Sequence, residues 1–299
     1  MASPSKPFDN SIASPGAKRY NLVMTVPSTE KEKIERIFRD IRARRARGER
    51  IVLGIQGVPP KKLLADAIAL SDEVIDLDMP IEGISRGLSE PYVPRVYCSI
   101  IRTIVANAIS IKGLTWLLLA TGIDKCDGGR FAGHQLETIL DIPVIGAENL
   151  EMVAQGYPIS QSNLPLFEKM TMITRSVVRP LLPAEKSALE SRRCRPTVGF
   201  WGVPPYDFDV LKLFPDTSHV YGWTRCMENR TPADLDLEMH VDPGIPTVFY
   251  AQTFCQKNSL AYWLAQKHDG LYVEADGRLT NSTRAKVEAF VRLNQLGRG

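Results

Sequence analysis

Cysteine is the residue type in this chain whose placement points most directly to chemistry. Five cysteines occur among the 299 residues. Cys126 and Cys255 each follow an apolar segment expected to be a strand, and Cys98 opens an apolar segment expected to be a helix. A thiolate at a helix N-terminus is stabilised by the backbone N–H groups and the helix dipole. Three such thiols meeting at one place would suit a soft iron site, or a [4Fe-4S] cluster with one iron left without a cysteine.

The same three cysteines could instead be packing residues, because free cysteine is among the most buried residue types. Cys194 precedes an expected strand, at the opposite end of its sheet, and we expect it to be inert. Cys226 lies in a polar segment, residues 223–230, that we interpret as a loop. The four histidines show no metal-ligand spacing, so we expect none of them to be a ligand.

The elements that must position these cysteines alternate along the chain. Short apolar segments of strand type are separated by segments of helical type, and this alternation predicts doubly wound parallel sheets of the α/β class. In such sheets the ligand crevice lies beyond the carboxyl ends of the strands. The expected strands are residues 51–55, 73–77, 116–120, 142–145, 197–201, 219–223, 247–250 and 270–274. The expected helices include 30–50, 61–70, 98–109, 208–214, one that ends at Lys267, and 282–296.

The two halves of the chain share a repeat. Residues 54–60 and 199–205 both match G-x-x-G-V-P-P, each after an expected strand. Cysteines recur as well, since Cys98 precedes Cys126 by 28 residues and Cys226 precedes Cys255 by 29. The repeat predicts two duplicated α/β domains. We expect a disordered arm over residues 1–18, an N-terminal domain over 19–160, a helical linker over 161–195 and a C-terminal domain over 196–299.

Composition narrows the classes of function. With 37 basic and 34 acidic residues the net charge is +3, which gives no general reason to expect nucleic acid as a partner. No apolar run approaches the ~18 residues of a membrane span, and the N-terminus lacks the apolar core of a signal peptide. We therefore expect a cytoplasmic protein with reduced thiols. No Walker P-loop, G-x-G-x-x-G, H-E-x-x-H or C-x-x-C motif occurs, which argues against the corresponding classes of site.

The order of these landmarks resembles the 2-hydroxyacyl-CoA dehydratase D-component family, which includes the ATP-dependent benzoyl-CoA reductase subunits. The resemblance spans roughly residues 35–295, as a short and divergent member. Residues 45–54 and 58–65 are similar to the family's opening helix, strand and P-x-E-L helix, and residues 97–99 and 125–127 are similar to the segments that carry its first two cluster cysteines. Residues 156–175 are similar to its G-x-x-I-S … R segment, and residues 252–255 to the K-F-C segment that carries its third cysteine. Residues 272–276 and 283–290 are similar to its closing I-E-x-D … T-R-x-x-A-F pattern.

The resemblance implies one low-potential [4Fe-4S] cluster per subunit, held by Cys98, Cys126 and Cys255. It implies radical dehydration of a 2-hydroxyacyl-CoA, or reduction of an aromatic acyl-CoA, with the open iron site binding the substrate carbonyl. The implied partners are a homologous subunit, as a homo- or heterodimer, and an ATPase activator protein that carries its own iron–sulfur cluster and supplies electrons.

Two other interpretations stay open at this point. In the first, the chain is a cofactor-free two-domain protein that closes on a small ligand. In the second, it is an electron-transfer cluster subunit of a larger complex, which a fourth thiolate from Cys226 would favour. The family pattern ends at three cysteines, and we predict that Cys226 is not a ligand.

Overall fold

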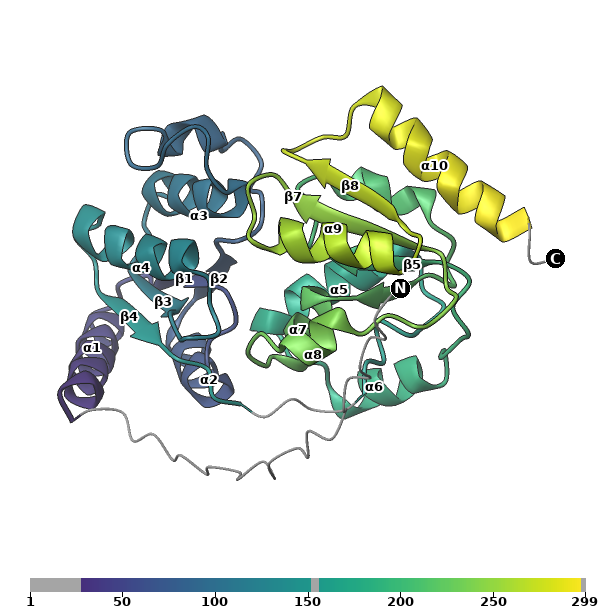
Figure 1. Cartoon of the computed structure of the whole chain (residues 1–299). Coiled ribbons are helices and arrows are strands. Elements are labelled where there is room, and N and C mark those ends of the chain that lie inside the picture. The colour runs from purple at the N-terminus through teal and green to yellow at the C-terminus, as the bar shows by residue number, and fades with distance from the viewer. Residues whose placement is uncertain (1–27, 152–155, 297–299) are drawn as a thin grey trace, which may run out of the picture.

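Two parallel β-sheets form the framework of the molecule. The computed structural model describes residues 28–151 and 156–296, so the arm expected at residues 1–18 lies outside the described residues. The sheets have four strands each, in the orders β2-β1-β3-β4 and β6-β5-β7-β8, and they occupy two separate lobes (Figure 1). The prediction of two doubly wound parallel-sheet domains is confirmed. The strands are β1 Val52–Gln56, β2 Glu73–Asp76, β3 Trp116–Ala120, β4 Val144–Ala147, β5 Gly199–Gly202, β6 His219–Tyr221, β7 Thr247–Gln252 and β8 Leu271–Ala275.

Helices connect and cover these strands. Four of them, η1, α4, α7 and α8, are absent from the expected elements; α4 has two glycines in its first turn, and η1, α7 and α8 are very short. No described helix is long and apolar enough to cross a membrane. The helices are α1 Ser28–Ala46, α2 Lys61–Leu70, η1 Arg86–Ser89, α3 Ser99–Ser110, α4 Asp127–Ile139, α5 Leu166–Val178, α6 Pro183–Glu190, η2 Phe208–Leu213, α7 Trp223–Asn229, α8 Leu235–Met239, α9 Lys257–Lys267 and α10 Asn281–Leu296.

The sequence of strand β3 is continuously apolar because both faces of the strand are covered. Trp116 and Leu118 face the core formed with α1 and α2, where the rings of Phe38 and Trp116 meet edge to face at 5.4 Å between centroids. Leu117 and Leu119 point to the opposite face, into the core formed with α3 and α4. Successive side chains of a strand alternate between faces, so a strand covered on both sides must be apolar throughout.

The sequence repeat corresponds to a structural repeat. Both sheets have the same strand order, and the two G-V-P-P loops follow the equivalent strands β1 and β5. Gly57 and Gly202 open these loops with φ angles of +68° and +155°. A Cβ atom on Gly202 would lie 2.3 Å from the carbonyl oxygen of Tyr250, so this position has no room for a side chain. The predicted duplication of the domains is therefore seen in the fold.

The segment between the two sheets packs against the second sheet. Helix α5 lies along α7 and η2. The carbonyl oxygen of Ser160 accepts a hydrogen bond from the N–H of Val220 in β6, at 3.2 Å. The carboxylate of Glu228 in α7 accepts hydrogen bonds from the N–H groups of Ile159 and Ser160. The linker expected over residues 161–195 thus covers the C-terminal domain rather than hanging free between two lobes.

The close approach at Gly202 gives a stability prediction. Gly202→Ala should lower the free energy of unfolding by about 3 kcal/mol or more, since the methyl group must displace backbone of the neighbouring strand. Gly48→Ala is the matched control, because Gly48 also has a positive φ, +81°, but nothing lies within 4 Å of its added Cβ. The control should lose only about 1 kcal/mol, from backbone strain. Equal losses in urea unfolding of the two variants would contradict the close contact.

Candidate functional site

The candidate site is a cavity of about 570 Å³ between the two domains. In each sheet the strand order reverses between the two central strands, so the connections that follow them run to opposite sides of the sheet. Ligands bind at such a topological switch point, beyond the carboxyl ends of the strands. The cavity is lined by the segments that follow all four central strands, so the two switch points face each other across it. These segments are residues 56–58 at the end of β1, 124–126 after β3, Val203 and Pro204 after β5, and Gln252 with residues 254–257 at the end of β7.

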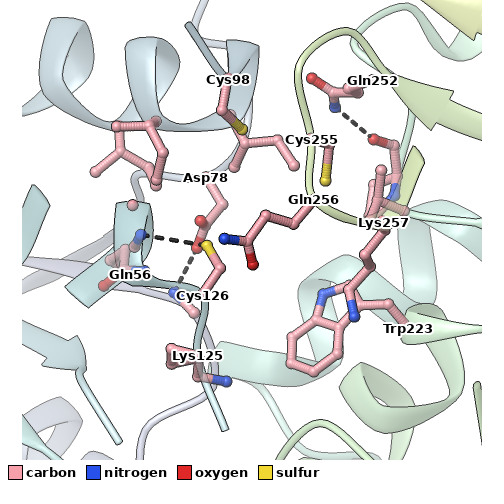
Figure 2. A pocket seen from close by; sticks show the side chains of 18 of the residues that line it. Gln56, Asp78, Cys98, Lys125, Cys126, Trp223, Gln252, Cys255, Gln256 and Lys257 are labelled. Carbon is pink, nitrogen blue, oxygen red and sulfur yellow. Dashed lines mark hydrogen bonds between the residues drawn. The ribbon is translucent and has the colours of Figure 1, made fainter. Parts of the chain in front are cut away.

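All three predicted ligands line this cavity. Cys98 is the N-cap of α3 and Cys126 is the N-cap of α4, both in the N-terminal domain. Cys255 comes from the other domain and immediately precedes Gln256, the N-cap of α9. Figure 2 shows their three sulfur atoms around one space, with the Gln256 side chain extending between them. The structure therefore brings together thiols that are far apart in the sequence.

A direct contact between the domains places Cys98 beside Cys255. Ser99, the first residue of α3, donates hydrogen bonds from its N–H and its hydroxyl to the carbonyl oxygen of Thr253, at 3.4 and 3.2 Å. Both side chains line the cavity. The neighbouring Cys255 thiol, helped by the N–H groups at the start of α3 and opposed by burial, lowers the pKa of Cys98 to about 7. The Cys98 thiol, together with burial, raises the pKa of Cys255.

Cys126 has a different environment at the open side of the cavity. Its side chain is exposed, and its sulfur accepts a hydrogen bond of 3.3 Å from the N–H of Gly129. Glycine also follows at position 128, where an added Cβ would lie 3.0 Å from the hydroxyl of Tyr97. The two glycines keep the first turn of α4 narrow, so the thiol and the helix N-terminus both face the cavity.

The loop that carries Cys255 is strained. Phe254 has a φ of +59°, a left-handed conformation that is costly for an aromatic residue. Its side chain is 53% exposed, so no buried packing accounts for the conformation. The turn closes through the Cys255 N–H, which donates to the carbonyl oxygen of Gln252 at 3.0 Å. Strain of this kind concentrates at functional sites, and here it turns a thiol into the cavity.

Two carboxyl groups form part of the wall. Asp76 ends β2 and Asp78 follows it, and both line the cavity. The N–H of Asp78 donates to the Asp76 carboxylate at 3.0 Å, and the N–H of Gly57 donates to the Asp78 carboxylate. Burial, with the neighbouring Asp78 charge, raises the pKa of Asp76 well above its usual range, and burial also raises the pKa of Asp78. The pair can therefore hold a proton beside a bound ligand.

An aromatic ring with two cations closes another side. Trp223, the first residue of α7, has the Lys125 Nζ 4.6 Å and the Lys257 Nζ 5.4 Å from its ring centroid. Each lysine also has an acidic partner, Asp124 at 2.8 Å and Glu238 at 2.7 Å. Lys125 belongs to the N-terminal domain and Lys257 to the other, so Trp223 is held between the two domains. Such contacts contribute up to about 2 kcal/mol when desolvated.

Cys226 differs from its predicted environment. It lies in helix α7 instead of a polar loop, it is fully buried, and burial raises its pKa to about 12. The spacing from Cys98 to Cys126 is 28 residues and that from Cys226 to Cys255 is 29, but the two first cysteines are not at equivalent helix positions. Cys98 is the N-cap of α3, whereas Cys226 is the fourth residue of α7. Strand β6 leads into α7 through Gly222 alone, while a long loop separates β2 from α3. Cys226 therefore faces the core.

Two further sequence features lie away from the cavity. Cys194 precedes β5, and its sulfur is 3.9 Å from Nε2 of His219. Residues 83–87 match G-x-S-x-G, a pattern that carries a nucleophile only on a strand–turn–helix. Here Ser85 caps the short η1 helix and accepts a hydrogen bond from the N–H of Gly87 at 3.2 Å. The serine is engaged in capping and lacks the strand context of a nucleophile elbow.

The donor set of the cavity is soft. Among the described residues that line it, cysteine is the donor preferred by iron–sulfur clusters, and no histidine lines it. As they stand, no three His, Cys, Asp or Glu side chains of the described residues form a ready metal site. By residue type, and because all three line one cavity, the three thiols are of the kind that ligates an iron–sulfur cluster. Comparison with protein-family models and with curated proteins finds no match to this chain.

Several residues of the site are missing from the sequence prediction. These are Asp76, Asp78, Lys257 and Trp223, all of which line the cavity. The sequence could have predicted the two aspartates, because Asp76 and Asp78 lie on either side of the last residue of an expected strand and residues at strand ends line the ligand crevice. For Trp223 and Lys257 the sequence carried no comparable signal, because their role depends on how the two domains meet.

Thiol labelling tests this geometry. With iodoacetamide at pH 8, the metal-free chain should label readily at Cys126 and more than about a hundredfold more slowly at Cys226. The reason is that the thiolate is the reacting form and that Cys226 is both buried and raised in pKa. Timed alkylation followed by peptide mass spectrometry measures both rates in one sample. Comparable rates would contradict the placement of Cys226 in the core.

Proposed function

We propose that Cys98, Cys126 and Cys255 ligate one [4Fe-4S] cluster in the interdomain cavity, and that the chain is an iron–sulfur enzyme subunit of the 2-hydroxyacyl-CoA dehydratase and benzoyl-CoA reductase type. One observation carries the proposal: three thiols, each at or just before a helix N-terminus, line a single cavity from both domains. The ordered motifs of the sequence support the same family.

The electrostatics of the cavity support an anionic group there. The N-termini of α3, α4 and α9 all meet at it, and each favours negative charge by about 0.3–1 kcal/mol. Lys125 and Lys257 also lie at the domain boundary, but each is paired with a carboxylate, that of Asp124 or Glu238, and adds no net charge. Thiolates and an attached cluster carry net negative charge, so the helix N-termini offset part of the cost of holding it in a partly enclosed site.

A cluster with one iron not bound by cysteine supplies an electron and a Lewis acid for a substrate carbonyl. The residues of the chain provide the rest. Ile100, Ile101 and Ile104 of α3 give an apolar wall that excludes water and accepts an acyl group. The Asp76–Asp78 pair holds a proton at the cavity wall, available to a leaving hydroxyl or a reduced ring. Gln56 presents a buried Oε1 without a hydrogen-bond partner, which can orient a donor group of the substrate.

Partners belong to the same proposal. Two large apolar side chains that line the cavity are exposed, Val96 at 70% and Phe254 at 53%. Exposed apolar residues at a cavity are typical of an interaction surface. We assign this surface to a homologous subunit or to an electron-donating activator with ATPase activity, in the cytoplasm, with an acyl-CoA as substrate.

Iron content tests the ligand assignment. Cys98→Ser, Cys126→Ser and Cys255→Ser should each lose most of the iron and sulfide that the anaerobically reconstituted parent protein binds, because a [4Fe-4S] cluster held by two protein thiolates is poorly retained. The parent should be brown, with about four iron and four sulfide per chain. Iron and sulfide assays with the visible absorption spectrum provide the measurement.

Matched controls keep this test sharp. Cys194→Ser and Cys226→Ala should retain the full cluster, since these side chains lie outside the cavity. Full iron retention by Cys126→Ser would refute the ligand set. A colourless, iron-free parent would instead favour a cofactor-free binding protein. Iron loss in Cys226→Ala, with normal folding by circular dichroism, would favour an electron-transfer subunit with four thiolates.

A further inference from the structure

The two duplicated domains differ in the connection that leads from an outer strand to the next helix. In the C-terminal domain Gly222 alone joins β6 to α7, whereas in the N-terminal domain residues 77–98 join β2 to α3. We call residues 77–98 the insertion. Both of its ends line the cavity, through residues 78–79 at the start and 96–98 at the end. The insertion is therefore part of the cavity wall.

The insertion is fixed to its own domain. The side-chain amide of Asn107 in α3 donates hydrogen bonds to the carbonyl oxygens of Leu77 and Met79, at 2.9 and 2.8 Å. Ser85 caps the η1 helix of the insertion, and η1 packs along α3. The middle of the insertion thus has a defined place beside α3, from which it faces the other domain.

Arg86, the first residue of η1, reaches from the insertion into the C-terminal domain. Its guanidinium donates to a carboxylate oxygen and to the carbonyl oxygen of Asp276, at 2.5 and 3.0 Å, and lies 4.4 Å from the ring centroid of Tyr206. Gly277 leaves room for this contact, because an added Cβ there would lie 3.0 Å from an Arg86 nitrogen. Figure 1 shows the arrowhead of β8, which ends just before Asp276, directed at the lobe that carries α3.

We propose that Arg86 is a positioning residue that holds the two domains closed over the cavity, and that its release from Asp276 admits molecules to the side of the cavity where Cys98 and Cys255 lie. Elements up to β4 form one domain and elements from α5 onward form the other, so noncovalent contacts fix how closely the domains meet at the cavity. The Arg86 side chain is only 14% exposed, so the contact is well enclosed.

The contact between Arg86 and Asp276 is ionic, which makes the closure sensitive to salt. The Asp276 side chain is 46% exposed, so dissolved ions reach it and weaken the attraction. The inference concerns access to the cavity of the proposed function, and it rests on that function only for the molecule admitted. Arg86 and Asp276 are not among the proposed cluster ligands.

Thiol alkylation of the full-length, metal-free chain measures the closure. At about pH 9, where most accessible thiols are ionised, iodoacetamide should react at least about tenfold faster with the half-buried Cys98 and Cys255 in Arg86→Met than in the parent protein. Loss of the charged hydrogen bonds makes opening more frequent. The rate at Cys126 should change by less than about twofold, because that side chain is already exposed. Timed alkylation with peptide mass spectrometry gives all the rates.

Two control variants and a salt series complete the test. Arg95→Met should leave the rates unchanged, since Arg95 is 82% exposed and pairs with Glu90 of the same insertion at 3.8 Å. Arg86→Lys should restore part of the protection, because it keeps the charge without the two-pronged contact. High salt should accelerate the reactions at Cys98 and Cys255 in the parent but not in Arg86→Met.

Three results would overturn the inference. The first is an unchanged rate at both Cys98 and Cys255 in Arg86→Met. The second is an equal acceleration at the buried Cys226, which would mean that the C-terminal domain unfolds rather than that the domains open. The third is the absence of any salt effect in the parent protein, which needs no variant to fold. The iron content of the reconstituted parent reports on the proposed function separately, so the two can fail independently.

Discussion

The site depends on the contact that fixes the two domains against each other. Ser99 binds the Thr253 carbonyl with two hydrogen bonds, and Arg86 binds both the side chain and the carbonyl oxygen of Asp276. The guanidinium of Arg86 also lies 4.4 Å from the ring centroid of Tyr206. Each hydrogen bond contributes only about 1 kcal/mol. Together they set the distance between two switch points, and neither domain contains the full set of three thiols alone.

The charges around the cavity are consistent with this arrangement. Three helix N-termini make it favourable for anions, while the Asp76–Asp78 pair responds to burial by holding a proton more tightly. Cys98 at the N-terminus of α3 and fully buried Cys226 in the middle of α7 have opposite pKa shifts, to about 7 and about 12. The same residue type therefore has two different chemistries within one fold, because Cys98 lies beside the Cys255 thiol and the N–H groups of α3 whereas Cys226 is buried in the core.

The sequence predicted the features that depend on local pattern. Apolar strands covered on both faces, the repeated G-V-P-P loops and the three cysteines after strands or before helices all follow from short-range spacing, and the alternation of elements predicted two parallel sheets. The sequence did not predict the features that depend on how helices and domains pack against one another. Cys226 matched the spacing of Cys98 but lies a turn further along its helix, because a single glycine replaces a long loop. Trp223 and Lys257 acquire their role only from the opposite domain, which no local pattern reveals.

The most direct test is a crystal structure of the anaerobically reconstituted protein, with iron located by its anomalous scattering. We predict one iron–sulfur cluster in the interdomain cavity, with the sulfur atoms of Cys98, Cys126 and Cys255 each within ~2.3 Å of an iron, a normal metal–thiolate distance. Iron bound outside this cavity, or a cluster ligated by Cys226, would contradict the proposed ligand set.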